Sequence, residues 1–267
     1  MTDNDVYEIY AVKYGENTGR AQSENFIGGD SNDHSGQLDY FVWAIVGRNG
    51  TYVVDTGFNH ETAAARGRKI DRLPKEGLAA VGIDVNTVRD VIVTHLHYDH
   101  AGTLSDFPNA RFHLQDSEMA YATGRCMCHG VLQFPYHVED VVTMVRKVYK
   151  GEVTFHDGDE ALAPGISVHH IGGHAKGLMS VRVRTRRGMV VLASDAAHLY
   201  ANMEEKRPFP IVYNVGEMME GWNKLYRLAD TPQHVVPGHD PLVMKRYPAV
   251  APEVEGIAVR LDVEPSR

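Results

Sequence analysis

The sequence predicts an α/β protein in which packed β-sheets are flanked by helices, and two observations lead to that class. Short runs rich in Val, Ile, Tyr and Phe recur along the chain and end at Gly, Asp or Pro, as strands do. Segments with apolar residues three to four positions apart lie between and after those runs, as in amphipathic helices. No linker, internal repeat or low-complexity tract divides the chain, so we expect one domain over residues 1–267.

The predicted strands come in clusters along the chain. They are Tyr40–Val46, Thr51–Asp55, Val91–Thr94, Arg111–Leu114, Ser167–Ile171, Met179–Thr185, Met189–Ala193 and His234–Val236. The run VRVRTRRGMVVLAS indicates a hairpin with Arg187-Gly188 at its turn. Its first strand alternates Val with Arg, which predicts one solvated face, whereas the second strand is continuously apolar and is predicted to be buried on both faces.

The predicted helices lie between and after these strands. They are Glu61–Ile70, Leu73–Val81, Asp116–Ala122, Val138–Lys150 and Val215–Ala229. Valines at positions 138, 141, 142, 145 and 148 fall near a period of 3.6 residues, so the fourth helix has one apolar stripe. That stripe predicts packing against the rest of the domain.

Composition restricts the partners and the compartment. A formal charge of -8 and a pI near 6.0 argue against a non-specific nucleic-acid or membrane binder, which usually carries a basic face. No apolar run approaches the ~20 residues that cross a bilayer, and the acidic N-terminal segment lacks a signal-peptide pattern. Two cysteines cannot build a disulfide framework. We therefore expect a cytoplasmic protein without a nucleic-acid or membrane partner.

The segment Thr94–Gly102, THLHYDHAG, carries the strongest motif of the chain. It places three histidines and an aspartate in six residues, and imidazole and carboxylate are ligands that suit zinc and related ions. His95 and His97 are two apart, so in extended backbone they point to the same side. Asp99 and His100 follow where the chain leaves the strand, with Gly102 allowing a sharp exit. Two groups of ligands can therefore diverge toward two neighbouring ions.

A four-coordinate site needs further ligands from elsewhere in the chain. Three candidates follow predicted strands: His174 in IGGHAKG, Asp195 in LASDAA and His239 in VVPGHDP. Rigid strands commonly place functional groups on the loops that follow them. Taken together with the first motif, these residues are interpreted as metal ligands.

Five blocks in this order make the chain resemble the metallo-β-lactamase superfamily. They are VVDTG (Val53–Gly57), THLHYDHAG (Thr94–Gly102), GGHAKG (Gly172–Gly177), ASDAA (Ala193–Ala197) and PGHDP (Pro237–Pro241). The resemblance implies an αββα sandwich of two facing mixed sheets with helices outside. It implies two divalent metal ions, with zinc expected and manganese, iron and cobalt left open by the ligand types.

The same resemblance implies a role for each ligand. One metal would be held by His95, His97 and His174, and the second by Asp99, His100 and His239. Asp195 would bridge both ions. Asp55 resembles the family's aspartate that orients a ligand from behind, and such partners fix ligand geometry.

Within the superfamily, the chain is most similar to the N-acyl homoserine lactonase group, whose members act in quorum quenching. Zinc-dependent β-lactamases usually carry Cys in place of Asp195, and the redox di-iron branch usually carries Glu in place of His97. The lactonases share a helical segment between the metal motif and GGH, which here would be a helical lid insertion at about residues 121–150. The resemblance implies a small-molecule lactone or ester substrate and makes a homodimer an expected assembly.

The implied reaction is hydrolysis of a lactone by a hydroxide that bridges the two metals, with Asp99 passing a proton to the leaving ring oxygen. The lactonases commonly carry a tyrosine three residues after the bridging aspartate, where this chain has His198. His198 or Tyr200 is therefore the candidate donor to the substrate carbonyl oxygen. Hydrolysis of another small ester, cyclic amide or thioester remains an alternative, as does a non-catalytic metal-binding sensor.

The pair Cys126 and Cys128, in Cys-Met-Cys-His, resembles a fragment of a zinc site. It has no second ligand pair at zinc-finger spacing, so a third metal is disfavoured. Packing inside the helical segment is the preferred interpretation.

Overall fold

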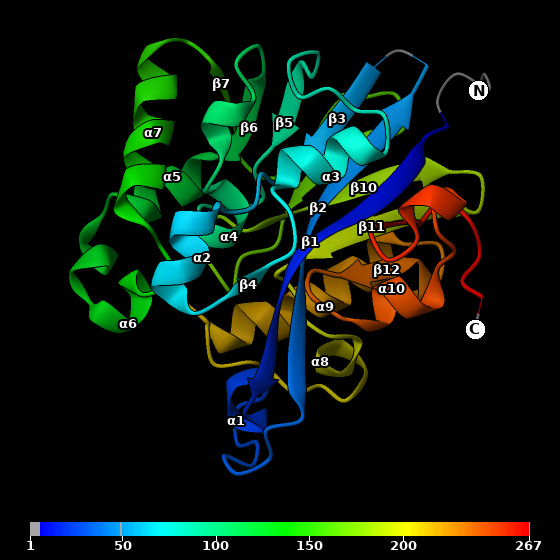
Figure 1. Cartoon of the computed structure of the whole chain (residues 1–267). Coiled ribbons are helices and arrows are strands. Elements are labelled where there is room, and N and C mark those ends of the chain that lie inside the picture. The colour runs from blue at the N-terminus through cyan, green and yellow to red at the C-terminus, as the bar shows by residue number, and fades with distance from the viewer. Residues whose placement is uncertain (1–5, 49, 267) are drawn as a thin grey trace.

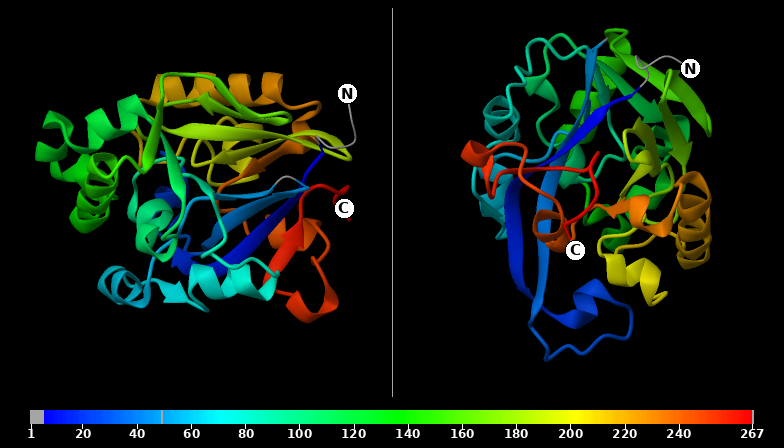
Figure 2. Two further views of the ribbon diagram at one scale, coloured as in Figure 1. Left: turned by 90° about the horizontal axis from the view of Figure 1, so that it is seen from above. Right: turned by 90° about the vertical axis from the view of Figure 1, so that its right-hand side faces the viewer.

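Two mixed β-sheets face each other in the computed structural model, which describes residues 6–48 and 50–266. The first sheet is eight-stranded, with the order β13-β1-β2-β3-β5-β6-β7 and with β4 paired to β1. The second has the order β12-β11-β10-β9-β8. Helices cover the outer faces, with α3 outside the first sheet and α9 outside the second (Figures 1 and 2). The predicted αββα sandwich is confirmed.

The first sheet consists of β1 (Glu8–Arg20), β2 (Gly36–Gly47), β3 (Gly50–Val54), β4 (Lys69–Ile70), β5 (Asp90–Ile92), β6 (Arg111–Gln115), β7 (Val153–His156) and β13 (Ala258–Arg260). The second consists of β8 (Glu160–Ala163), β9 (Ile166–His170), β10 (Met179–Thr185), β11 (Gly188–Ser194) and β12 (Val235–Pro237). The α-helices are α1 (Gln22–Asn25), α2 (His60–Arg66), α3 (Pro74–Ala80), α4 (Tyr98–Ala101), α5 (Asp116–Ala122), α6 (Gly130–Gln133), α7 (Val138–Tyr149), α8 (Tyr200–Glu204), α9 (Val215–Leu228) and α10 (Leu242–Arg246).

Alternate side chains of β2 point to opposite faces of the first sheet and belong to two separate buried clusters. Phe41, Trp43 and Ile45 point toward the second sheet and join one buried cluster, which also contains Trp222 of α9. The alternate residues of β2 join the other buried cluster, beneath the helices that cover the first sheet. Successive side chains of a strand point to opposite faces, so one apolar strand serves both layers.

Most predicted elements are found, and the bounds of α5 and β10 match the prediction. The predicted helix 61–70 is wrong at its end. Gly67 adopts a left-handed conformation with φ 61° and stops α2, after which Lys69 and Ile70 pair with β1. The hairpin turn is also displaced by one residue, because Thr185 pairs with Gly188 and leaves Arg186-Arg187 as the two-residue loop.

The sequence prediction missed β1, the longest strand. Its register against β2 shifts between Lys13 and Gly15 and again between Thr18 and Arg20, and such bulges break the alternation of apolar and polar residues. β1 and β2 form a long hairpin that carries α1 near its tip (Figure 1). The C-terminal strand β13 pairs with β1 and completes the sheet edge.

The helical segment 121–150 lies beside the metal motif. The amide of Tyr98 donates to the carbonyl of Pro135 at 2.9 Å, and Arg66 of α2 donates to the carbonyls of Phe134 and Tyr136 at 3.0 Å each. These contacts join the segment to the start of α4, which follows β5, and to the end of α2. Within the described part of the chain, no helix has the length and apolar character needed to cross a membrane.

Candidate metal centre

The loops that follow strands of both sheets meet at one place and bring the predicted ligands together. The loop after β5 runs into α4, and the loops after β9, β11 and β12 reach the same point from the second sheet. The seven residues that converge are His95, His97, Asp99, His100, His174, Asp195 and His239. Gly102 ends α4 with an ordinary right-handed backbone, and an added Cβ would lie 2.8 Å from the carbonyl oxygen of Gly57. Close backbone packing, rather than a left-handed turn, therefore favours glycine there.

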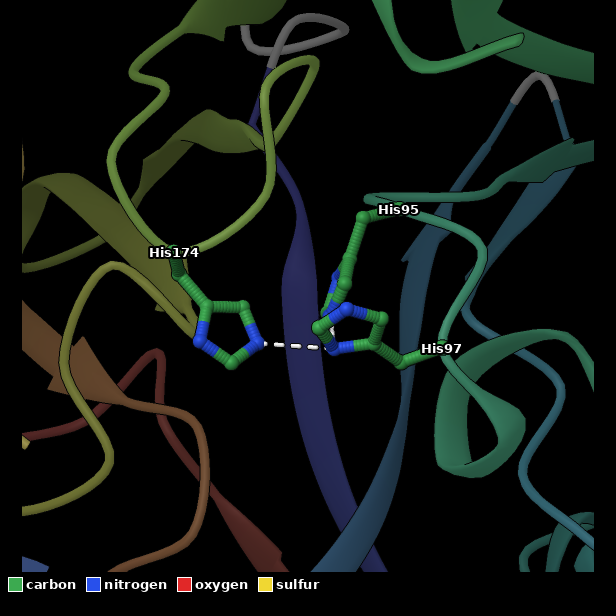
Figure 3. Close-up of side chains that lie close together, drawn as sticks. All are labelled: His95, His97 and His174. Atoms are coloured by element: carbon green, nitrogen blue, oxygen red, sulfur yellow. Dashed lines mark hydrogen bonds between the residues drawn. The ribbon is translucent and has the colours of Figure 1, made fainter. Parts of the chain in front are cut away.

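Three histidines form the first group. Nδ1 of His97 lies 3.0 Å from Nε2 of His95 and 2.9 Å from Nε2 of His174 (Figure 3). Zn–N bonds of about 2.0–2.1 Å in tetrahedral geometry separate ligand nitrogens by roughly 3.3 Å, so this spacing is close to that of a metal-bound set. Burial and the neighbouring imidazoles hold the pKa of His95 and of His97 well below the usual value. Both rings are therefore in the neutral form that ligates metals.

Asp99, His100 and His239 form the second group. Nε2 of His100 lies 3.8 Å from Oδ1 of Asp99, and Nε2 of His239 lies 3.8 Å from Oδ2 of the same carboxylate. Both histidines are buried. The three ligand atoms face one another across a space that one cation could occupy.

The Asp195 carboxylate lies between the two groups. Its Oδ2 is 3.2 Å from Nε2 of His174, in the first group. Its Oδ1 is 2.9 Å from Nε2 of His239 and 3.3 Å from Nε2 of His100, in the second. Each oxygen thus faces one group, which is the arrangement that a bridging carboxylate needs.

Hydrogen bonds from the opposite ring nitrogens fix three of the histidines. Nδ1 of His174 donates to the carbonyl of Ile211 at 2.7 Å, and Nδ1 of His239 donates to the carbonyl of Asp39 at 2.9 Å. Nδ1 of His100 donates to Oδ2 of Asp55 at 2.8 Å. In the neutral ring, each of these bonds places the hydrogen on Nδ1 and directs the Nε2 lone pair at the cluster, as the partners of metal-bound histidines do.

Asp55 is held behind the cluster in a strained conformation. It has a φ of 62°, and Ser194, next to Asp195, has a φ of 48°. Thr94 connects the two, because its amide donates to Asp55 Oδ1 at 2.8 Å and its hydroxyl lies 2.8 Å from the Ser194 hydroxyl. Burial raises the pKa of Asp55, and the adjacent His100 opposes that rise. Backbone strain of this kind persists where surrounding contacts determine the conformation.

The donor set fits two divalent cations. Among the described residues, Nε2 of His100 and Oδ1 of Asp195 are buried and form no hydrogen bond. Buried polar atoms normally have partners, so these two atoms have lone pairs available for a cation. Imidazole and carboxylate ligands suit zinc and also admit manganese, iron and cobalt.

The two candidate donors to the substrate are placed differently. Nε2 of His198 donates to Oδ2 of Asp195 at 3.0 Å, and its ring stacks on Phe209 with centroids 3.6 Å apart. Burial lowers the pKa of His198 to about 3, so the ring is neutral. Tyr200 is not brought to the cluster. It lines a different cavity, with the guanidinium of Arg246 stacked 4.1 Å from its ring centroid.

A small cavity beside the cluster contains residues that the sequence prediction missed. Arg20, Tyr40, Arg68 and Tyr98 line it, together with metal-cluster residues and with Phe134 and Pro135 of the helical segment. Tyr98 lies inside the motif and could have been found from its position. The arginines could not, because only the pairing of β4 with β1 brings Arg68 next to the end of β1.

The cysteines lie apart from this centre. Cys126 is half-buried and packs against the buried cluster beneath the helices, whereas Cys128 is exposed. Neither belongs to a group of converging ligand atoms among the residues that the structure describes.

A family model for the metallo-beta-lactamase superfamily matches residues 35–248. That match covers most of the chain, and the protein belongs to this superfamily.

Among its relatives is the N-acyl homoserine lactonase AiiB of Agrobacterium fabrum, 30% identical over 160 residues. That match covers 59% of this chain and 56% of the relative, so the chain spans little more than half of that protein. The N-acyl homoserine lactonase AiiA of Bacillus thuringiensis subsp. kurstaki is 26% identical over 187 residues, which are 64% of this chain and 69% of that protein.

Solved structures show the same fold. A quorum-quenching N-acyl homoserine lactone lactonase superposes with a TM-score of 0.73 and 22% identity, covering 90% of this chain and 95% of that one. AidC, described as a dizinc quorum-quenching lactonase, gives a TM-score of 0.66 with 14% identity over 90% of this chain and 92% of that one.

Proposed function

We propose that the protein is a dinuclear metal-dependent hydrolase that opens a lactone ring. The observation that carries the proposal is the Asp195 carboxylate, whose two oxygens face two separate groups of buried ligands. Relatives named as N-acyl homoserine lactonases support the same reaction class. The proposal includes zinc as the resident ion.

The ligand roles proposed for the chain follow the two groups. His95, His97 and His174 would hold one ion, and Asp99, His100 and His239 the other, with Asp195 shared between them. When bound, two such ions supply a hydroxide near neutral pH and stabilise negative charge on a carbonyl oxygen. In the net reaction the acyl–oxygen bond breaks, the acyl carbon gains the oxygen of water, and the ring oxygen gains a proton.

The chain's own residues would position the substrate and move that proton. Asp99 lines the cavity with an accessible carboxylate edge, and a carboxylate so placed can pass a proton to the ring oxygen. Phe134 and Pro135 form part of the cavity wall, which supports a role for the helical segment 121–150 as a lid that excludes water.

A panel of purified substrates tests this function. Protein loaded with zinc should hydrolyse N-acyl homoserine lactones, as followed by proton release, and His97→Ala should abolish that activity. Surface variant Glu253→Gln is the matched control and should keep the wild-type rate. Activity confined to thioesters or cyclic amides would replace the lactone assignment, and no hydrolysis of any class with both metals bound would support a non-catalytic metal-binding protein.

We propose that His198 either turns the N–H that it donates to Asp195 toward the substrate oxygen, or keeps that N–H on Asp195 and holds the carboxylate in place. Loss of one donor to a developing oxyanion costs ~2.7–4 kcal/mol, so His198→Ala should lower kcat roughly 100- to 1000-fold while two metals stay bound. Tyr200→Phe should keep the wild-type rate, because Tyr200 lies in another cavity. Metal analysis separates the two roles of His198. If His198→Ala loses metal as well as rate, His198 acts by holding Asp195. A loss of rate in Tyr200→Phe alone would contradict both roles.

The assembly and the compartment are proposed on sequence grounds. The two free cysteines support a cytoplasmic location, because disulfides are rare in that reducing compartment. Similarity to the lactonases supports a homodimer, which light scattering of the purified protein would test.

A further inference from the structure

Two arginines line the wall of the cavity beside the metal cluster. We propose that Arg68, supported by Arg20, is an anion-binding subsite, and that the substrate is a lactone or ester that carries a carboxylate group. The hydrolysis of this substrate rests on the proposed function. The binding of its carboxylate rests only on the two arginines.

The two guanidinium groups meet at one neutral acceptor. With the Asn17 amide oriented to satisfy both, its Oδ1 accepts from Nη1 of Arg20 at 2.8 Å and from Nη1 of Arg68 at 3.3 Å. Arg20 also donates through Nε to Oδ1 of Asn25 at 2.8 Å and through Nη2 to the carbonyl of Glu24 at 2.9 Å. Each of the three guanidinium nitrogens of Arg20 therefore has a protein partner, and the side chain is only 6% exposed, so its role is to orient Asn17 and to add positive charge.

Arg68 is oriented but not saturated. Its Nε donates to the Tyr98 hydroxyl at 3.2 Å, and that hydroxyl lies 3.1 Å from the hydroxyl of Tyr40, which also lines the cavity. Its contacts among the described residues use Nε and Nη1, which leaves Nη2 for a ligand. A guanidinium held at two nitrogens presents a preorganised donor to a planar anion.

No carboxylate of the described residues forms a close ion pair with Arg68, although the more distant Asp99 carboxylate helps to raise its pKa, and burial lowers the pKa of Arg20. In the described part of the chain no carboxylate lies within 4.0 Å of Arg68, and the nearest to Arg20 is the exposed Glu24, 3.8 Å from Nη1. Partly buried cations without a paired carboxylate are costly. A bound anion would relieve that cost, which gives a physical reason for placing two arginines on this wall.

The geometry separates the two ends of the substrate. The metal cluster would receive the ester carbonyl, and Arg68, which lines the same cavity, would receive a carboxylate elsewhere on the substrate molecule. A neutral acyl chain offers nothing to a guanidinium. The subsite therefore favours carboxylate-bearing lactones or esters over neutral ones of the same size.

The experiment compares matched substrates and matched variants. Zinc-loaded protein is given a neutral lactone and the same lactone bearing a carboxylate, and the ratio of their kcat/KM values is measured for wild type, Arg68→Gln, Arg68→Lys and Arg186→Gln. Arg186 is exposed on the β10–β11 turn, so its variant changes the net charge equally without touching the cavity. A charge-assisted hydrogen bond is worth roughly a tenfold to hundredfold preference.

We expect Arg68→Gln to lower the ratio by at least tenfold, mainly through KM for the carboxylate substrate. The ratio for Arg68→Lys should lie between those of wild type and Arg68→Gln, because lysine keeps the positive charge and loses the planar guanidinium. Arg186→Gln should keep the wild-type ratio. An equal ratio in wild type and Arg68→Gln would overturn the proposal.

A binding measurement keeps the subsite separate from the hydrolase activity. Calorimetric titration with succinate, glutarate and adipate, each compared with a monocarboxylate of similar length, should show a preference for one dicarboxylate that Arg68→Gln removes and Arg186→Gln retains. That result without hydrolysis of any lactone would uphold the anion subsite and refute the proposed function. Equal binding of dicarboxylates and monocarboxylates by wild type would refute the subsite even if lactones are hydrolysed.

Discussion

Glu118 is a buried carboxylate that accepts hydrogen bonds from three segments around the metal cluster. Its Oε1 accepts from the amide of Leu96 at 3.0 Å and from the Tyr136 hydroxyl at 2.8 Å, and its Oε2 accepts from the amide of Gly177 at 3.0 Å. Leu96 stands between two proposed ligands, Gly177 follows the His174 loop, and Tyr136 belongs to the helical segment. One side chain thus connects the loops that carry proposed ligands to the helical segment 121–150.

Glu118→Gln should destabilise the protein by about 1–3 kcal/mol, because an amide cannot accept on both sides and one buried N–H loses its partner. Tyr136→Phe is the matched control, since it removes one donor and leaves both backbone amides satisfied, and it should cost less. Urea unfolding of the two variants measures the difference. Equal losses would show that the backbone amides do not depend on the carboxylate.

The position of Asp195 between the two groups of ligands leads to a test by metal content. Asp195→Ala should reduce occupancy at both sites, because each carboxylate oxygen faces one group. His239→Ala should chiefly empty the second site. Metal-to-protein ratios by elemental analysis distinguish the two, and identical losses in both variants would contradict the assignment of shared and single roles.

Residue types and spacing were sufficient to predict which side chains converge at the cluster, and insufficient to predict what surrounds them. His174, Asp195 and His239 were recognisable because each follows an apolar strand, where loops carry functional groups. Tyr200 was misleading, because it begins α8 and its ring turns toward Arg246, away from the cluster. Arg68 gave no signal, because its position depends on strand pairing between distant segments.

The first turn of α7 contains Asp140, a carboxylate in a largely buried position. Burial raises the pKa of Asp140 to about 6, and the neighbouring His137 opposes the rise. Because the folded pKa is above the unfolded value of 3.8, the folded state binds the proton more tightly. Stability from this group is therefore present below about pH 4 and is lost as the pH rises through about 6.

Asp140→Asn should remove the loss of folding stability that ionisation of Asp140 causes as the pH rises. At pH 7 the variant should be more stable than wild type by roughly 1–2 kcal/mol, reduced from the full shift because the site is partly solvated and the charge favours the helix N-terminus. At pH 4 the two proteins should unfold at nearly the same urea concentration. A variant that is less stable than wild type at both pH values would show that helix-dipole and His137 contacts outweigh burial.

Elements with unbroken patterns were predictable, and those with interruptions were not. α5 and β10 keep one period throughout, and their bounds agree with the sequence prediction. β1 mixes charged and apolar residues across two register shifts, so no single period describes it. β4 is two residues long, and it is a strand only because it pairs with β1.

At the scale of the whole molecule, the metal centre joins two sheets that otherwise meet through apolar packing. Four proposed ligands follow β5 in the first sheet, and three follow strands of the second. Without bound cations, the carboxylates and imidazoles would lie close together in a buried site. Metal binding is therefore expected to contribute to global stability as well as to catalysis.

Removal of metal by a chelator should lower the melting temperature by roughly 10 °C, since a ligand at 1,000 times its dissociation constant contributes about 4 kcal/mol. Zinc, cobalt or manganese should restore both the melting temperature and the hydrolytic activity. Calorimetry and lactone hydrolysis on the same samples provide the measurement. Full activity in a preparation with only trace metal would contradict the dinuclear assignment.

The antiparallel return of β13 to β1 has a consequence for the order of events during protein synthesis. The first proposed ligands leave the ribosome well before the last, and the residues between His100 and His239 take roughly 7–28 s to translate at ordinary rates. Both groups of ligands need residues from the later half, and the first sheet gains its edge strand only at Ala258–Arg260. Both complete sets of ligands therefore exist only after nearly complete translation, and until then the emerging chain exposes His95, His97 and His100 without their later partners.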